Sequence, residues 1–134
     1  IIPGSILRIL DDDRPVIYQG VGAYKREFMY IDDVIDAYMF IQDRGLPGEA
    51  YNIGGAGFLN IFDTVNIIIE EMGVDIMPQI LTKDFIEIKE QYLDPSKLQN
   101  LGWDCKFKIR EGIRAAIPWY KEYHKDPQQF YWAH

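Results

Sequence analysis

The chain has 134 residues, of which 48% are hydrophobic and 26% are charged, and its formal net charge is −7. These values indicate one globular domain, and the acidic balance argues against nucleic acid or an anionic membrane as a partner, because both require a basic surface. The single cysteine, Cys105, excludes an intramolecular disulfide and is typical of a reducing cytoplasm. No apolar run is long enough to cross a membrane. Because the first residue is Ile1, we expect the sequence to begin inside a longer protein.

The first residues predict a helix followed by a strand. Residues 3–10 have the apolar spacing of a short amphipathic helix. The acidic run at 11–13 that ends it indicates a solvated loop, because a metal site would need more ligands than this run supplies. Residues 14–18 are expected to form a short strand with Pro15 at its entrance, and residues 19–23 a flexible turn. The apolar side of the helix comprises Ile2, Ile6, Leu7 and Leu10.

The next stretch, residues 25–38, predicts a strand that runs directly into a helix. Charged and large apolar residues alternate over residues 27–31, which is the two-residue period of a half-buried strand. Asp32 stands where a helix N-cap is expected, and Asp33 would add negative charge at the positive end of the helix dipole. Arg26 is a fork-shaped cation at the edge of a rigid element, a geometry that suits a phosphate group. One apolar face of the helix is expected to contain Val34, Ala37, Tyr38 and Ile41.

The rest of the chain predicts further short helices and strands. Strands are expected at residues 50–53, 77–81 and 91–93. Helices are expected at residues 33–43, 61–72 and 109–123, and a brief one begins with Asp94-Pro95 and ends at Gly102. Pro118 lies inside the last helix, where it costs on the order of 3 kcal/mol unless the helix kinks or restarts.

The glycine-rich turn at residues 54–57 looks like the opening of a dinucleotide-binding fingerprint but is predicted to have another role. The third glycine position is Asn60. The strand that follows contains Gln79 as its only polar side chain, so it offers no acid for a ribose, although Asp75 lies just before it. We therefore expect a tight turn into a helix that is capped by Asn60, with Asp63 three residues later.

Four motifs keep the same order and spacing as in a known enzyme family. They are Ile2-Pro3 with an amphipathic turn, residues 26–34, Tyr51-Asn52-Ile53-Gly54-Gly55, and residues 92–98 with Leu101-Gly102-Trp103. Up to Tyr123 the chain resembles the NAD-dependent nucleotide-sugar epimerases and dehydratases, which are extended short-chain dehydrogenases, and residues 87–94 are most similar to the CDP-glucose 4,6-dehydratase branch. The resemblance implies an α/β fold, with α+β character in isolation. Residues 1–134 would form the C-terminal substrate-binding domain, in which residues 33–54 complete a Rossmann sheet that begins upstream.

The resemblance also implies a wall for the base of the substrate. The segment that corresponds to Pro15, Val16, Ile17 and Tyr18 lines the base pocket in the dehydratases, and the region of Ile2 and Pro3 lies beside it. An apolar strand edge with an aromatic residue suits a flat base. Alternatively, Val16 and Ile17 are simply core residues.

The diphosphate of the substrate is expected to bind Arg26. The alternative for this arginine is a structural ion pair with Glu27 or Asp32. Many relatives carry a second arginine for the pyrophosphate, but this chain offers only Lys83 and Lys89 nearby. A lysine supplies charge without the bidentate fork of an arginine, so the second phosphate ligand stays open.

The catalytic groups of that family are not expected in this chain. Catalysis in the family rests on a Tyr-x-x-x-Lys pair, a serine or threonine, and NAD held by a glycine-rich turn. None of the nine tyrosines here has a lysine four residues later. We expect His124 and His134 to be surface residues without a triad or metal partner, and Cys105 to be a structural thiol.

We therefore expect the chain to bind the nucleotide-diphosphate sugar of an NAD-dependent 4,6-dehydratase or 4-epimerase and to be inactive by itself. NAD or NADP would be bound mainly by an upstream N-terminal Rossmann domain, and the full protein is expected to be a cytoplasmic homodimer. One alternative is a non-catalytic binding or assembly module, in which an unpaired strand and the aromatic tail at 125–134 contact partners. A second alternative is a sugar-nucleotide reductase.

Overall fold

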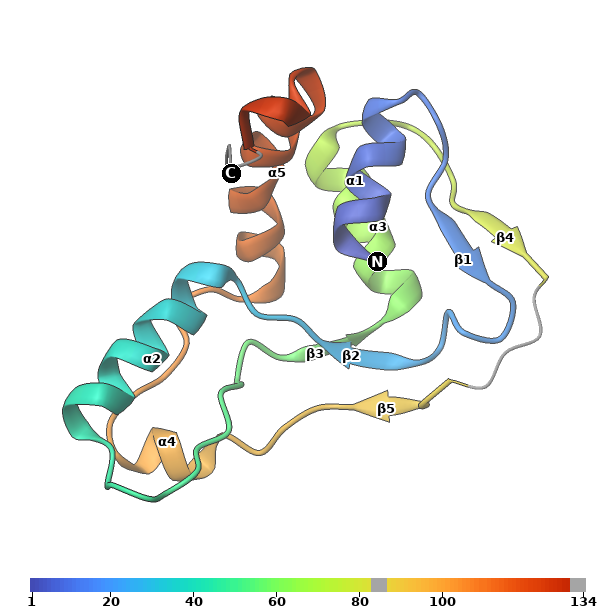
Figure 1. Cartoon of the computed structure of the whole chain (residues 1–134). Coiled ribbons are helices and arrows are strands. Elements are labelled where there is room, and N and C mark those ends of the chain that lie inside the picture. The colour runs from blue at the N-terminus through green and yellow to red at the C-terminus, as the bar shows by residue number, and fades with distance from the viewer. Residues whose placement is uncertain (83–86, 131–134) are drawn as a thin grey trace.

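A computed structural model describes residues 1–82 and 87–130, the last two of them by backbone alone. The helices are α1 (Ile2–Leu10), α2 (Ile31–Arg44), α3 (Ile61–Met72), α4 (Ser96–Asn100), α5 (Ile109–Lys125) and the 3-10 helix η1 (Pro127–Phe130). The strands are β1 (Val16–Tyr18), β2 (Lys25–Glu27), β3 (Phe58–Asn60), β4 (Gln79–Leu81) and β5 (Glu90–Gln91). Helices with short strands confirm the predicted α/β class (Figure 1).

The strands form two small sheets. In the first, β1 pairs in parallel with β4, with Ile17 opposite Ile80. In the second, β2 is the central strand: it pairs antiparallel with β3, where Arg26 is opposite Leu59, and in parallel with β5, where Arg26 is opposite Gln91. Arg26 therefore lies on the middle strand of a sheet, with its backbone fixed from both sides.

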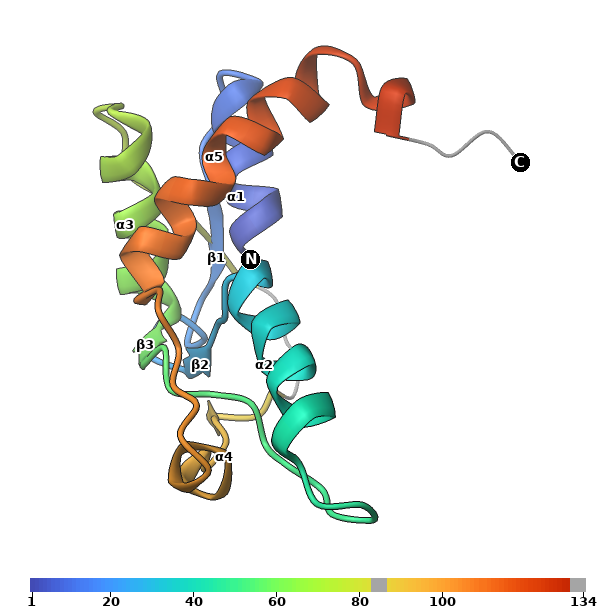
Figure 2. The same cartoon turned by 90° about the vertical axis from the view of Figure 1, so that its left-hand side faces the viewer.

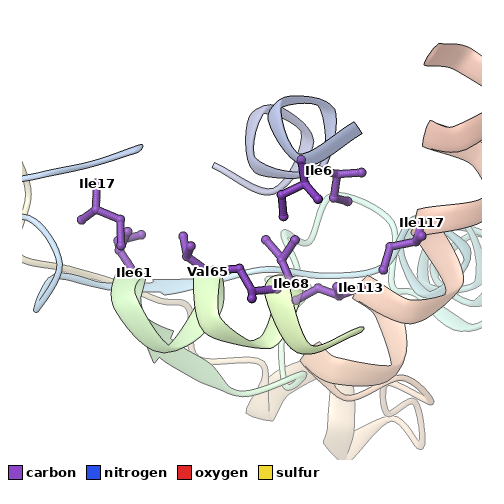
Figure 3. Packing of buried hydrophobic residues seen from close by; sticks show 9 residues of the cluster. Ile6, Ile17, Ile61, Val65, Ile68, Ile113 and Ile117 are labelled. Carbon is purple, nitrogen blue, oxygen red and sulfur yellow. The ribbon is translucent and has the colours of Figure 1, made fainter. Parts of the chain in front are cut away.

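An aliphatic core joins α1, α3 and α5 (Figure 3). The predicted cap of α3 is confirmed, because the Asn60 side chain accepts a bond of 2.7 Å from the Asp63 amide, and Gly73 ends the helix with φ 69°. Ile17 of β1 lies at one end of the core beside Ile61 (Figure 3). The buried members of the core are Ile6, Ile9, Ile17, Ile61, Val65, Ile68, Ile69, Ile113 and Ile117.

Ion pairs connect α3 to α5 above this core. Glu71 accepts from Arg114 Nε at 2.6 Å and from Arg110 Nη1 at 2.8 Å. Arg110 Nη2 also donates to Glu70 at 2.6 Å. The hydrogen bonds from Arg114 and Arg110 lower the pKa of Glu71 to about 2.

A second, smaller cluster lies between α2, α4 and the loops near them. Figure 2 shows α2 and α4 at the end of the molecule away from η1. The carboxylate of Asp33, which is 1% exposed, accepts from the amides of Lys106 at 3.1 Å and Phe107 at 2.9 Å. The indole of Trp103 donates to Asp36 at 2.9 Å. The buried members of this cluster are Ala37, Ala56, Leu98, Trp103 and Cys105.

In the stretch at residues 25–38, the strand and the helix both begin earlier than the sequence pattern predicts. The strand β2 ends at Glu27, the first residue of the predicted range 27–31, and α2 begins directly after Tyr30, which is its N-cap. The prediction that Asp32 caps this helix was therefore wrong. The carbonyl of Tyr30 already accepts from the Val34 amide at 3.3 Å, so Asp32 lies within the first turn, where its charge still favours the helix dipole.

The buried side of α2 differs from the predicted apolar face at Tyr38, whose exposed fraction is 65%. Asp33 lies on the buried side instead. Its bonds to the 106–107 backbone explain this, because they hold the Asp33 side of the helix against that loop. The other predicted positions, Val34, Ala37 and Ile41, are buried or half-buried.

The predicted strand at residues 50–53 is not a strand. A strand requires a paired neighbour, and none of the described residues pairs with this segment. Its side chains are nonetheless placed: Tyr51 and Ile53 pack against the second cluster, and Asn52 Nδ2 donates to the Asp94 carbonyl at 3.2 Å.

The last two helices are confirmed with small shifts at their ends. The carboxylate of Asp94 accepts from the Ser96 amide at 2.9 Å, and α4 begins at Ser96. α5 continues through Pro118 to Lys125 without a break. At its start the Lys108 amide donates to Glu111 at 2.8 Å, which supplies a cap where the lysine side chain cannot.

Candidate functional site

A cavity of about 570 Å³ opens between β1, β2 and the start of the chain. Most of its wall is aliphatic or aromatic. Arg26 and Glu87 are the charged residues among those that line it. The described residues that line this cavity, which we call the Arg26 cavity, are Ile1, Val16, Ile17, Tyr18, Val21, Arg26, Phe28, Ile61 and Glu87.

Of the predicted set, the structure brings Arg26, Val16, Ile17 and Tyr18 to one cavity. Val16 and Tyr18 are half-buried on β1, whereas Ile17 is 2% exposed and belongs to the aliphatic core. Ile17 is therefore a core residue, as the alternative for it holds, and it also lines the cavity. Pro15 does not line the Arg26 cavity, because it is fully buried before the strand.

Ile2 and Pro3 line a neighbouring cavity of about 290 Å³ instead. This second cavity lies between the start of α1, the β2–α2 connection and the start of α5. Ile1 and Phe28 line both cavities, so the two are adjacent. The structure thus places Ile2 and Pro3 beside the Arg26 cavity and not in its wall.

The Arg26 side chain, 14% exposed, is held at the edge of its cavity by two hydrogen bonds. Nη1 donates to the Lys25 carbonyl at 2.8 Å, and Nη2 donates to Glu87 Oε1 at 2.7 Å. The alternative partners considered for this arginine, Glu27 and Asp32, were therefore wrong. The cationic fork is a well-placed, mostly desolvated group that can donate to an anion.

Glu27, next to Arg26, binds the glycine-rich turn. Successive side chains of a strand point to opposite faces. The Glu27 carboxylate accepts from the Gly55 amide at 2.7 Å and from the Leu93 amide at 3.2 Å. A carboxylate at this turn does not fit the pyrophosphate of a dinucleotide, which supports the prediction that residues 54–57 are a tight turn and not a cofactor site.

Sequence reasoning missed Glu87 and Phe28 as lining residues, and also Ile1, Val21 and Ile61. Glu87 lies 61 positions after Arg26, in a stretch without periodicity, and only the pairing of β2 with β5 brings the two together. Phe28 comes directly after β2 and belongs to the motif at residues 26–34. Its large apolar side chain was the signal in the sequence that could have identified it as a lining residue. Lys89, one candidate for the second phosphate ligand, does not line the Arg26 cavity, and Lys83 falls outside the described residues.

The remaining reactive side chains are placed as structural groups. Burial raises the pKa of the Cys105 thiol, so it is protonated and packs in the second cluster. His124 pairs with an exposed carboxylate, because its Nε2 lies 2.7 Å from Asp11 Oδ1. His134 and the aromatic side chains of the tail lie outside the described residues.

Within residues 1–82 and 87–130, no group of three or more His, Cys, Asp or Glu side chains is arranged to hold a metal ion. No helix in the described part of the chain is long and apolar enough to span a membrane.

An apolar cavity with one convergent cation on an α/β scaffold is the common form of a small-molecule binding site. Residues 1–54 match the family model described as "NAD dependent epimerase/dehydratase family". A dTDP-D-glucose 4,6-dehydratase of Bos taurus is 29% identical over 133 residues, which cover 91% of this chain and 36% of that protein. A probable dTDP-glucose 4,6-dehydratase of Sinorhizobium fredii is 31% identical, over 91% of this chain and 37% of that protein. The chain thus spans little more than a third of these relatives.

Solved structures agree with these matches. A UDP-N-acetylglucosamine 4-epimerase of Methanobrevibacter ruminantium, in complex with UDP-N-acetylmuramic acid, superposes with a TM-score of 0.81 at 26% identity, over 91% of this chain and 39% of that one. A dTDP-glucose 4,6-dehydratase of Bacillus anthracis in complex with NAD shares the fold, with a TM-score of 0.82 at 23% identity over 93% of this chain and 40% of that one. These matches together support a fragment of an NAD-dependent nucleotide-sugar epimerase or dehydratase, to which the chain is similar along nearly its whole length.

Proposed function

We propose that this chain is the substrate-binding part of an NAD-dependent 4,6-dehydratase or 4-epimerase and that the Arg26 cavity binds the nucleotide diphosphate of the sugar substrate. One observation supports this most directly. A mostly buried arginine and the apolar strand β1 line the same cavity. A nucleotide diphosphate has the matching parts, a flat base and a doubly charged diphosphate.

The two walls suggest how the ligand is oriented. The base would lie against Val16 and Tyr18, where an apolar surface and nearby main-chain groups favour a flat ring. The diphosphate would then lie toward Arg26, whose planar fork can donate two parallel hydrogen bonds to phosphate oxygens. The sugar would project out of the cavity toward a catalytic centre supplied by another part of the protein.

The chemistry is assigned to residues outside this chain. In the described residues the glycine-rich turn is bonded to Glu27, so we place the nicotinamide cofactor, NAD or NADP, on an upstream Rossmann domain. When bound, that cofactor would accept a hydride from the sugar. The role of this chain is to hold the nucleotide so that the sugar is presented at a fixed distance, which makes the reaction effectively unimolecular.

The exposed side of α2 supports the presence of such a domain. Four large apolar residues lie at helical spacing on this side, and each is more than half exposed. A patch of this kind on one helix marks an interaction surface. We expect the Rossmann domain to cover this patch, which consists of Ile31, Ile35, Tyr38 and Met39.

Titration of nucleoside diphosphates tests the proposal. We expect Arg26→Ala, in the polypeptide as encoded in full, to weaken binding of the preferred nucleoside diphosphate by about 1–3 kcal/mol, because a charge-assisted pair is lost. Arg44→Ala is the matched control, since Arg44 is an exposed arginine at the end of α2 that pairs only with Asp43 among the described residues. Equal affinities for the two variants in isothermal titration calorimetry would refute the assignment of Arg26.

A further inference from the structure

The Arg26 cavity already contains an anion of the protein's own. Of the nine described residues that line it, only Arg26 and Glu87 are charged. Their side chains form an ion pair, with Nη2 and Oε1 separated by 2.7 Å. The cation that would bind a diphosphate is therefore occupied by a carboxylate.

The two partners of this pair are held very differently. Arg26 lies on the central strand β2, is 14% exposed, and also donates to the Lys25 carbonyl. Glu87 lies before β5, is 39% exposed, and has no other hydrogen bond or ion pair to a residue in the described ranges. If one partner moves when a ligand arrives, the carboxylate is the one free to do so.

A phosphate and this carboxylate compete for the same donor. Both groups are acceptors that require Nη2, and two anions at one site repel each other strongly when water is largely excluded. We propose that Glu87 is a resident counter-ion of Arg26 that the diphosphate displaces, so that it weakens binding and selects ligands of high charge. A weakly charged ligand cannot replace an existing ion pair, whereas a diphosphate offers more charge and two acceptor oxygens. This inference rests on the proposed function.

The test compares two glutamates on the same short segment. Glu87→Gln keeps the size of the side chain and removes its charge. Glu90→Gln makes the same change three residues later, where the carboxylate lies 3.5 Å from Lys25 Nζ and does not line the cavity. Each variant of the polypeptide as encoded in full is titrated with UDP, dTDP, CDP and GDP, and the tightest ligand is also compared with its nucleoside monophosphate.

We expect Glu87→Gln to tighten binding of the preferred nucleoside diphosphate about tenfold, because a like charge is removed from the site. Glu90→Gln should change it less than about twofold, since that exposed charge is screened by salt. The ratio of monophosphate to diphosphate dissociation constants should also decrease in Glu87→Gln. In the Arg26→Ala background, Glu87→Gln should lose most of its effect. Circular dichroism melting curves check that each variant is folded.

The outcomes separate this inference from the proposed function. If Arg26→Ala weakens binding while Glu87→Gln behaves like Glu90→Gln, Arg26 keeps its role and the counter-ion inference is wrong. If Glu87→Gln weakens binding, Glu87 positions Arg26 instead of competing for it, which also overturns the inference. Binding that appears only in Glu87→Gln supports both proposals, and absence of binding in wild type and variant alike refutes both.

Discussion

The molecule contains two regions that are held together in different ways. The bundle of α1, α3 and α5, together with Ile17 of β1, packs nine buried aliphatic side chains into one core. The cluster around α2 and α4 is smaller, and its buried hydrophobic members are two alanines, one leucine, one tryptophan and one cysteine. Its loops are held largely by carboxylates that accept from backbone amides, with Asp33 as the most buried example. The sheet with Arg26 lies between the two regions (Figure 1).

This difference indicates that the two regions have different roles. On α3 and α5 the exposed large apolar side chains are Phe62 and Trp119, each less than half exposed, whereas α2 leaves four that are more than half exposed. A region that depends on a few polar bonds and exposes an apolar helix face is suited to docking against another part of a protein. Under the proposed function, the bundle would support the β1 wall of the Arg26 cavity, and the α2 region would contact the rest of the protein.

The largest expected effect is in the bundle core. Ile68→Ala should lower the free energy of unfolding by about 2–5 kcal/mol, because Ile68 is fully buried and the substitution leaves a cavity. Ile35→Ala, the same change on the exposed side of α2, should cost less than about 1 kcal/mol. Urea unfolding of both variants measures the contrast, and equal losses would show that the two regions do not differ as described.

In the α2 region we expect the most damaging substitution to remove a polar side chain and not an aliphatic one. Asp33→Ala should destabilise the chain by about 1–3 kcal/mol, because the amides of Lys106 and Phe107 lose their acceptor. Asp32→Ala, which removes an exposed carboxylate from the first turn of α2, should cost less than about 1 kcal/mol. Hydrogen exchange should accelerate at residues 106 and 107 only in the first variant. Slow exchange there in Asp33→Ala would contradict the assigned role.

Acid should weaken the connection between α3 and α5. The folded-state pKa of Glu71 is lowered to about 2 by its bonds to Arg114 and Arg110, so the stability it contributes is complete above its ordinary pKa. That contribution is lost as the pH falls from about 4.5 toward about 2. Urea midpoints over this range should decrease less steeply for Glu71→Gln than for wild type. Identical slopes would mean that the ion pairs do not stabilise the folded state.

The smallest effect is expected at the exposed side of α2. Tyr38→Ser should change the stability of the 134-residue chain by no more than about 0.5 kcal/mol, since this side chain is 65% exposed. In the polypeptide as encoded in full, the same substitution should be clearly destabilising if another domain covers α2. An equally small effect in both contexts would argue against a covered face.

Sequence patterns predicted the helices well because their signals are local. The cap at Asn60 and the stop at Gly73 mark α3 in the sequence, and the structure confirms both. The strand at residues 50–53 failed because strand pairing depends on distant segments that no local pattern reveals. The same limit applies to the site. The motif at Arg26 was recognisable, but its partner Glu87 is placed by strand pairing across 61 positions.

The most direct test of the account is a crystal structure of the polypeptide as encoded in full with its preferred nucleoside diphosphate bound. We predict phosphate oxygens within hydrogen-bonding distance of the Arg26 guanidinium and the base against Val16 and Tyr18, with Glu87 displaced from Nη2. A nucleotide bound elsewhere, with the Arg26–Glu87 pair intact and the β1 wall uncovered, would contradict the assignment of this cavity as the substrate site.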